Sequence, residues 1–232
     1  FSASSLLECS ENFLRELREI CDKKKIILIF DEIYTGWGKT GELFYFMKHN
    51  NLVPDVLTMS KSFGGGKSSI SCFTTTNEIF NKAYGDIQDS TIHSTTYNAF
   101  GEETITALEA VNIVIEDKYP QKSKDIGNLI NINLKNLKQK YPNQIKEIRG
   151  KGCLQGIFFH SGPEIIKKII SLIPSKLTND ERFISKLITS SVINELYSEY
   201  NILTSLGQNK DICLWISPSI IVAEDDIKYF FE

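Results

Sequence analysis

The sequence predicts an α/β protein: part of a large, mostly parallel-sheet domain followed by a small α+β domain. Residues 26–32, IILIFDE, are a continuous run of strand-forming apolar residues that ends in acids, typical of a strand buried on both faces of a parallel sheet. A second short strand, VLTMS, is expected at 56–60, after the chain break at Pro54-Asp55. Beyond about residue 117 short strand-like runs alternate with helical segments, which is the pattern of an α+β domain.

The first half of the chain alternates helix, strand and loop. Residues 6–22 carry apolar side chains at helical intervals and predict an amphipathic helix. Residues 35–41, TGWGKTG, are rich in glycine and predict a loop. A third strand is expected at 70–76, ISCFTTT, and the spacing of apolar residues predicts a helix from about 98 to 115.

The second half is expected to begin with a helix over 122–140, and further helices are expected at 181–198 and 223–231. Between them lie four strand-like runs: IKEIRG (145–150), CLQGIFFH (153–160), NILTSL (201–206) and ICLWIS (212–217). We therefore divide the chain into a large-domain portion, residues 1–117, and a small domain, residues 118–232.

Composition excludes several classes of protein. The 232 residues are 41% hydrophobic and 24% charged, as in ordinary soluble globular proteins, and no apolar run is long enough to span a membrane. A net charge of −3 predicts no attraction to nucleic acid or to a membrane surface. The five scattered cysteines show no metal-ligand spacing, so we expect no metal site and a reducing, cytoplasmic setting. The absence of an initiator methionine suggests a piece of a longer chain.

The stretch SKSFGGGKSS, residues 60–69, contains two lysines that could carry chemistry. Gly66-Lys67-Ser68 looks like the end of a phosphate-binding P-loop, GxxxxGK[ST]. However, the first glycine of that motif would fall at Lys61, and a strand rather than a helix is expected after Lys67. The sequence therefore disfavours a nucleotide site at Lys67.

Lys61 has a different setting, at the end of a predicted strand, where α/β sheets bind ligands. A partly desolvated lysine there can act as a nucleophile toward an aldehyde; the alternative is an ordinary surface lysine in a glycine loop. Asp31 ends the other predicted strand, where a buried carboxylate needs a cation. An aspartate on a pyridinium nitrogen and a lysine Schiff base are the protein's part in pyridoxal phosphate chemistry. Ile33, two residues after Asp31, could pack beneath the ring. The alternative for Asp31 is a cap of the following loop.

Four blocks of the sequence together resemble the class III (ornithine/4-aminobutyrate-type) pyridoxal-phosphate-dependent aminotransferases, in the C-terminal portion of that family. The blocks are LIFDEIYTGWGKTGELF (28–44), PDVLTMSKSFGGG (54–66), IHSTTYNAFGEETITALEAV (92–111) and IKEIRGKGCLQGIFF (145–159). They occur in the order and spacing of the family and cover most of the chain. The resemblance implies fold type I and pyridoxal 5'-phosphate as cofactor.

The resemblance also implies roles for individual residues. Lys61 would be the Schiff-base lysine and Asp31 the partner of the pyridine nitrogen. Thr96 would bind the cofactor phosphate of the neighbouring subunit in a homodimer with shared active sites, a role favoured by the helix expected after it. The alternative for Thr96 is an ordinary helix cap. Tyr34 occupies the position of a glutamine that bonds the ring hydroxyl in the best-known members, a bond that a phenol can also make.

Two departures bear on function. The opening half of the family, with its phosphate loop and ring-stacking aromatic residue, is missing, and Leu214 falls where many members carry an arginine for the substrate carboxylate. We therefore expect an aminotransferase acting on small amine and keto substrates, active only with the missing N-terminal part. The alternatives are an aminomutase or lyase of the same fold, or a truncated relic that serves only as an interaction subunit.

Overall fold

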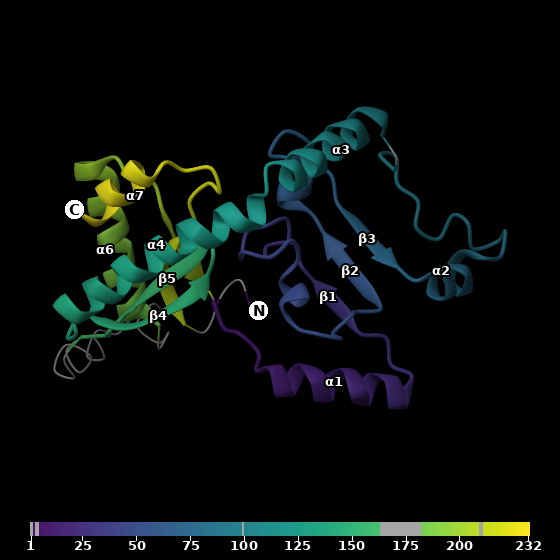
Figure 1. The fold of residues 1–232 in the computed structure, drawn as a ribbon, viewed down its shortest axis with the longest axis horizontal. Helices are drawn as coiled ribbons and strands as arrows, with labels where there is room; N and C mark the ends of the chain where they lie inside the picture. The colour runs from purple at the N-terminus through teal and green to yellow at the C-terminus, as the bar shows by residue number, and fades with distance from the viewer. Residues whose placement is uncertain (1, 3–4, 99, 163–181, 209–210) are drawn as a thin grey trace, which may run out of the picture. The chain divides into compact units, whose positions relative to one another are not determined.

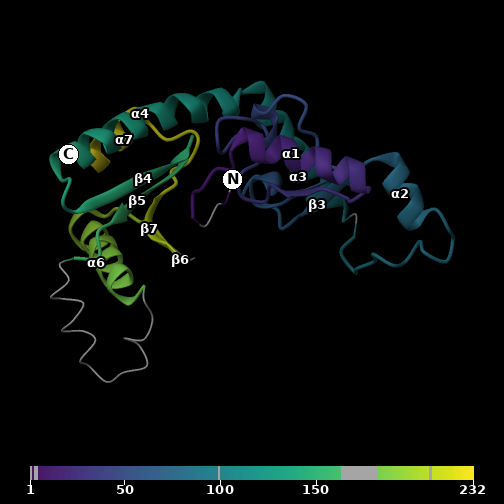
Figure 2. The same cartoon turned by 90° about the horizontal axis from the view of Figure 1, so that it is seen from below.

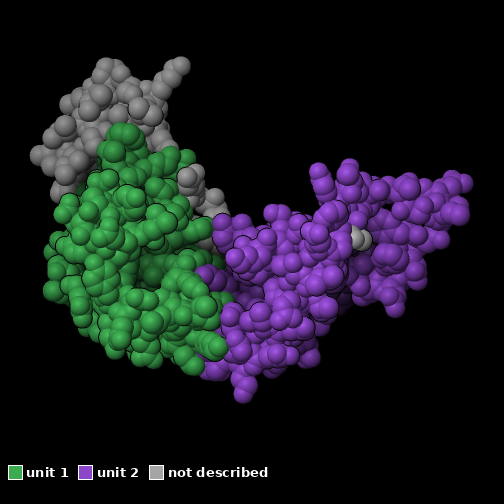
Figure 3. Space-filling view, turned by 90° about the horizontal axis from the view of Figure 1, so that it is seen from above, with its two compact units in different colours: residues 1–8, 122–232 green, residues 9–121 purple. Residues whose placement is uncertain are grey.

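The computed structural model describes residues 2, 5–98, 100–162, 182–208 and 211–232 (Figure 1). The chain forms two compact units, residues 9–121 and residues 1–8 with 122–232 (Figure 3). Residue 181, the expected start of a helix, lies outside the described residues. The assignment of residues 1–117 and 118–232 to a cofactor-binding and a small domain stays a prediction.

The unit of residues 9–121 is built on a three-stranded sheet in the order β1-β2-β3 (Figure 1). The strands are β1 (Ile29–Asp31), β2 (Val56–Met59) and β3 (Cys72–Thr75). β1 and β2 run parallel, whereas β3 runs antiparallel to β2. All three strands lie within the segments predicted from the sequence. The sheet is therefore mixed, with one parallel and one antiparallel pair of strands.

The prediction that β1 is buried on both faces is wrong for this chain by itself. Side chains alternate along a strand, and Phe30 is half-buried on one face of β1. Ile29, on the other face, remains 57% exposed. A continuous apolar run shows that both faces of a strand are suited to burial. In this unit, however, the described residues cover only one face of β1.

Three α-helices and two short 3-10 helices complete this unit. α1 (Glu11–Lys24) begins where the Ser10 hydroxyl accepts a hydrogen bond from the Phe13 N–H at 3.2 Å. α3 (Gly101–Glu116) confirms the helix expected after residue 98. The sequence analysis missed α2 (Asn77–Tyr84), which is only eight residues long and buries none of them. The 3-10 helices are η1 (Tyr45–Lys48) and η2 (Lys61–Gly64).

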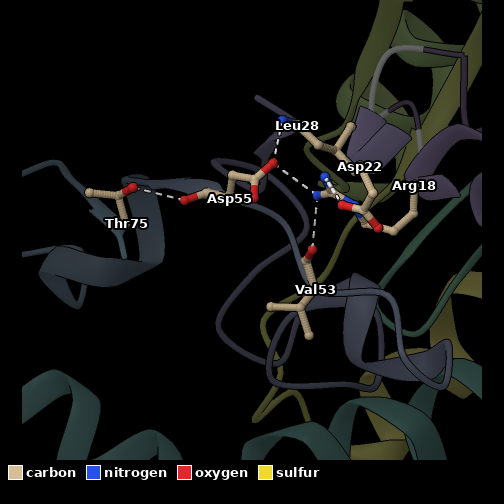
Figure 4. A network of polar contacts seen from close by, with 6 residues as sticks. All are labelled: Arg18, Asp22, Leu28, Val53, Asp55 and Thr75. Atoms are coloured by element: carbon tan, nitrogen blue, oxygen red, sulfur yellow. Dashed lines mark hydrogen bonds and ion pairs between the residues drawn. The ribbon is translucent and has the colours of Figure 1, made fainter. Parts of the chain in front are cut away.

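Arg18 of α1 is bonded to the segment that leads into β2 (Figure 4). Its guanidinium donates to the carboxylate of Asp55 at 2.9 Å and to the carbonyl of Val53 at 3.3 Å. The same Asp55 carboxylate accepts the Leu28 N–H at 2.7 Å, and the Asp55 carbonyl accepts the Thr75 hydroxyl at 2.8 Å. Asp55 therefore links α1 to the three strands. Burial alone would raise the pKa of Asp55, but the Leu28 N–H and the Arg18 cation outweigh it and lower that pKa.

The other unit is an antiparallel four-stranded sheet with helices packed on it (Figure 2). The strands follow the order β4-β5-β7-β6, and each overlaps one of the four predicted runs, β6 only at residues 205–206. They are β4 (Ile145–Lys151), β5 (Leu154–Phe159), β6 (Ser205–Gln208) and β7 (Ile212–Ile216). The helices are α4 (Tyr119–Lys140), which enters this unit at residue 122, α6 (Phe183–Tyr200) and α7 (Glu224–Phe231). Ile130 and Leu134 of α4 are fully buried in the core with Leu214 of β7.

Residues 5–8 are bound to this second unit rather than to the first. Leu6 is buried with Leu154 and Phe158 of β5. Gly156 makes room for it, because a Cβ there would lie 2.6 Å from a Leu6 methyl carbon. Arg149 donates to the Ser5 carbonyl at 3.2 Å and also pairs with two carboxylates of its own unit. Within the described ranges, no helix is long and apolar enough to cross a membrane.

Candidate functional site

Asp31 and Lys61 follow the carboxyl ends of two neighbouring parallel strands. Asp31 is the last residue of β1 and lies opposite Thr58 of β2 in the register of the sheet. Lys61 comes shortly after β2 ends at Met59. The carboxyl ends of parallel strands share one edge of the sheet, which is where α/β proteins bind ligands. The pairing of β1 with β2 thus brings the two predicted catalytic residues to the same edge.

The Asp31 carboxylate is held by donors from both strands. Its Oδ1 accepts the Thr58 hydroxyl at 3.1 Å and the Ile33 N–H at 3.0 Å. The sequence analysis expected a buried carboxylate, but Asp31 is exposed, because the described residues leave this edge of the sheet open. Those residues place no hydrogen bond on Oδ2, so that oxygen can accept a further donor.

Ile33 does not share a strand with Asp31. β1 ends at Asp31, and Ile33 lies in the turn that follows, with its N–H bonded to the Asp31 carboxylate. The expectation that strand alternation puts Ile33 on the face of Asp31 is therefore wrong, since the alternation stops where the strand stops. The half-buried Ile33 side chain still lies next to Asp31 in the chain.

Glu32, which the sequence analysis did not single out, shapes the loop beside Asp31. Its carboxylate is only 3% exposed and accepts the N–H groups of Tyr45 and Phe46 at 2.9 and 2.8 Å. It also accepts the Thr35 hydroxyl at 2.5 Å. A buried carboxylate needs such donors. The paired acids Asp31-Glu32 at the end of the predicted strand were the available signal.

Lys61 begins η2 with a backbone conformation that is rare for a side chain other than glycine. Its φ is 50°, in the left-handed region, and such strain clusters at functional sites. The Lys61 Nζ lies 4.1 Å from the centroid of the Tyr34 ring. Lys61 was expected to be partly desolvated, but it is exposed, because the described residues leave this sheet edge open.

The glycines after Lys61 let η2 pack closely against α3. Gly65 has a φ of 61°, and a Cβ there would lie 2.9 Å from the Ala110 Cβ. The Ser68 hydroxyl bonds the Glu103 carboxylate of α3. After Lys67 the chain enters β3 and not a helix, so the geometry of a P-loop is absent from this described segment. The glycines therefore allow η2, which begins at Lys61, to pack against α3, and they do not form a P-loop.

Thr96 lies in an exposed turn ahead of α3. The N-cap of α3 is Phe100, and no side chain caps the helix, so the alternative that Thr96 is a helix cap is wrong. The Thr95 hydroxyl bonds the Asn98 side chain at 3.1 Å within this turn. The role of Thr96 in phosphate binding stays a prediction.

The position suggested for a substrate-binding arginine is closed to solvent. The Leu214 side chain is 2% exposed in the core under α4. A residue at 214 therefore points into that core, and the expectation that it stands where a substrate carboxylate binds is wrong. Trp215, the next residue of β7, faces the opposite side of the sheet, since side chains alternate along a strand. Among the described residues no three His, Cys, Asp or Glu side chains form a metal-binding group.

Comparison with known proteins places this arrangement in a family. Residues 4–182 match the family described as aminotransferase class-III. An uncharacterised aminotransferase of Schizosaccharomyces pombe is 25% identical over 215 residues, which are 93% of this chain and 41% of that protein. An aminotransferase of Bacillus anthracis superposes on 97% of this chain and 47% of its own, with a TM-score of 0.76 and 24% identity.

The ornithine aminotransferase of Toxoplasma gondii superposes with a TM-score of 0.74 and 23% identity over 95% of this chain and 45% of its own. At such identities the structural likeness shows the fold, which is that of the fold type I aminotransferases. The chain spans less than half the length of each of these three relatives. The sequence match covers most of the chain, and the chain therefore belongs to the class III aminotransferase family.

Proposed function

We propose that the complete protein is a pyridoxal-phosphate-dependent aminotransferase that works on small amine and keto substrates. The observation that carries the proposal is the placement of Asp31 and Lys61 at one edge of the sheet, through the pairing of Asp31 with Thr58. Membership of the class III family supports it. One structure of the Toxoplasma gondii ornithine aminotransferase is described as having partial occupancy of pyridoxal phosphate at its active site.

The residues at this edge fit the cofactor. Thr58 and Ile33 bond Oδ1 of Asp31, so Oδ2 can accept a further donor, which suits a protonated pyridine nitrogen. The exposed Lys61 amine lies at the end of the neighbouring strand, where it could hold the cofactor aldehyde. Ile33 would lie beneath the ring, and the Tyr34 hydroxyl would bond the ring hydroxyl. When bound, pyridoxal phosphate supplies an electron sink for charge that develops at the substrate Cα.

The chain's own residues would then divide the work as follows. Asp31 would hold the pyridine nitrogen of the cofactor and favour its protonated form, because a carboxylate stabilises a neighbouring cation. Lys61 would hold the cofactor aldehyde through Nζ. When it is free, the same Nζ could accept a proton from the substrate Cα and later donate it, as general base and then general acid. Glu32 would be a positioning residue, because its hydrogen bonds fix the turn that contains Ile33 and Tyr34.

A homodimer with shared active sites is part of the proposal. Thr96 is exposed in its turn, which leaves its hydroxyl accessible to a neighbouring subunit. α3 buries Ala107, Ala110 and Val114 within this chain, yet Ile105 and Leu108 are 71% and 61% exposed. A helix that is apolar on more than one face is normally covered in the complete protein. A second copy of the chain would cover that apolar surface.

A cytoplasmic location also belongs to the proposal. The five cysteines are all free, which suits a reducing compartment, where disulfides are rare.

Borohydride trapping of the cofactor tests the proposal. The full-length protein is incubated with pyridoxal phosphate, reduced, digested and mapped by mass spectrometry. We expect the pyridoxyl group on Lys61 and not on Lys67, because only Lys61 lies at the edge shared with Asp31. Lys61→Ala should abolish both the label and transamination, while Lys67→Ala is the matched control in the same loop. A label on Lys67 in the wild-type protein would contradict the assignment.

Product analysis with an amino donor, with and without an added keto acid, separates transamination from mutase or lyase chemistry.

A further inference from the structure

We propose that the face of the Tyr34 ring is the docking site of the Lys61 amine whenever that amine is not bonded to the cofactor. This inference rests on the proposed function and adds a second role for Tyr34. The Lys61 Nζ lies 4.1 Å from the centroid of the Tyr34 ring. That distance is well within the range of about 6 Å over which an ammonium is attracted to an aromatic face.

The sheet itself produces this contact. Asp31 and Thr58 are paired in register across β1 and β2. Tyr34 stands three residues after Asp31, and Lys61 stands three residues after Thr58. The backbone turns at the end of each strand. The segment after β1 turns directly after Asp31, and the segment after β2 turns at Lys61, whose backbone is left-handed. The two side chains are therefore brought together by the register of two neighbouring strands.

Hydrogen bonds of Glu32 fix the turn that carries Tyr34. Glu32 accepts two backbone N–H groups from Tyr45 and Phe46, and its own carbonyl accepts the Gly36 N–H at 3.0 Å. Trp37 of the same loop stacks on Phe63 of η2, with ring centroids 5.3 Å apart. The ring of Tyr34 and the backbone of Lys61 thus belong to two segments that are packed on each other. Tyr34 itself is 42% exposed, so its ring is accessible.

The ring face and the hydroxyl of one tyrosine can serve different partners. An ammonium is attracted to the face of the ring, whereas the hydroxyl lies in the ring plane. Tyr34 could therefore bond the cofactor through its hydroxyl and hold the Lys61 amine on its face. A side chain without an aromatic ring, such as glutamine, would offer no such face. We classify Tyr34 as a positioning residue for Lys61.

The test measures the contact directly in full-length protein from which the cofactor has been removed. Lysines are reductively methylated with ¹³C-formaldehyde, and the methyl signals are assigned by NMR with a Lys61→Arg variant. We expect the Lys61 methyl signals to be displaced upfield by the ring current of Tyr34. Tyr34→Phe keeps the ring face and should keep the displacement. Tyr34→Leu removes the face and should abolish it.

The chain offers internal controls for this measurement. Lys67 lies in the same loop, and Lys48 lies 5.4 Å from the centroid of the Tyr45 ring. Neither signal should respond to a change at Tyr34. Under limiting reagent, the extent of Lys61 methylation relative to Lys67 should rise by about two- to fivefold in Tyr34→Leu, as expected for loss of an exposed cation–π contact.

The outcomes separate this inference from the proposed function. Trapping of pyridoxal phosphate on Lys61 reports on the function and needs no aromatic ring at residue 34. Two results would overturn the docking site alone, provided that pyridoxal phosphate is trapped on Lys61. One is a Lys61 methyl signal that is not displaced, and the other is a displacement that persists in Tyr34→Leu. A displacement that is lost in Tyr34→Phe also overturns it, because the hydroxyl and not the face would then hold the amine. A ring-dependent displacement without trapping overturns the proposed function, while the contact itself stands.

Discussion

The amine of Lys61 lies 4.1 Å from the centroid of the Tyr34 ring, and Tyr34 follows Asp31, the last residue of β1, by three residues. Three side chains with different chemistry, a carboxylate, a phenol and an amine, therefore lie at the ends of two paired strands. The arrangement depends on two supports, the donors on Asp31 and the loop folded around Glu32. Each support leads to a prediction that can be tested in the full-length protein.

Asp31→Asn removes a charge at nearly constant shape. The neutral amide does not stabilise a protonated pyridine nitrogen. The cofactor would therefore be a weaker electron sink for the charge that develops at the substrate Cα. We expect turnover to fall at least a hundredfold, which corresponds to about 2.7 kcal/mol of lost transition-state stabilisation. The cofactor absorbance should remain after gel filtration. Near-normal turnover would instead mean that Asp31 only caps the turn at Ile33.

Thr58→Val is the companion change, because it deletes one donor to Asp31 and keeps the charge. We expect a much smaller loss of turnover than in Asp31→Asn. Equal losses in the two variants would show that the position of the carboxylate, and not its charge, limits the rate.

Glu32→Ala leaves the N–H groups of Tyr45 and Phe46 without their acceptor. An unsatisfied buried polar group costs about 1–3 kcal/mol, so loss of the acceptor of two N–H groups should lower the free energy of unfolding by about 2–6 kcal/mol. Urea denaturation followed by circular dichroism measures it. Glu42→Ala, a half-buried acid of the same loop, is the control and should cost much less. Similar losses at both positions would contradict the role given to Glu32.

Asp55 predicts how stability changes in acid. Its pKa in the folded protein is lowered: burial opposes the shift, but the Leu28 N–H and Arg18 outweigh it. The unfolded chain has an ordinary aspartate pKa of about 4. The stabilisation from Asp55 is therefore complete above about pH 4 and is lost as the pH falls through the lower folded value.

Thermal unfolding between about pH 6 and pH 2 tests this linkage. Asp55→Asn should be less stable than the wild type at pH 6, and the difference should shrink on acidification. Asp22→Asn is the control, because Asp22 also pairs with Arg18 but its side chain is 66% exposed. A difference between Asp55→Asn and the wild type that does not change with pH would contradict the linkage.

Thr96 tests the shared site. If its hydroxyl bonds the phosphate of the neighbouring subunit, Thr96→Ala loses a hydrogen bond to a charged group, worth about 1.5–3 kcal/mol, or about 10- to 150-fold in cofactor affinity. Equilibrium dialysis against pyridoxal phosphate measures the loss. Thr91→Ala, in the same exposed segment, should bind normally.

Mixed dimers provide the stricter form of this test. A Lys61→Ala chain combined with a Thr96→Ala chain should regain one intact site in some heterodimers, so activity should rise above that of either parent. Mixtures that stay inactive, together with an active monomer on sizing, would rule out the shared site.

The sequence alone predicted most of the elements and favoured Lys61 over Lys67, an assignment that stays a prediction. Strand-forming runs at 26–32 and 56–60 became β1 and β2, and the glycines after Lys61 became the turn that follows β2. The missing first glycine and the strand after Lys67 excluded a P-loop. These features are local: propensity and turn chemistry act over a few residues, so a sequence records them directly. The short helix α2 was missed because its eight residues are fewer than the roughly 11–18 over which a helical period is read.

Contacts between segments were decided only by the tertiary structure. The pairing of Asp31 with Thr58, the donors that Tyr45 and Phe46 give to Glu32, and the position of Lys61 over Tyr34 all depend on how separate segments fold together. The same holds for burial: an apolar residue such as Ile29 or Leu214 has an identical propensity whether it is exposed or enclosed. Strand register and packing fix these outcomes, and both arise from long-range contacts that no short stretch of sequence contains.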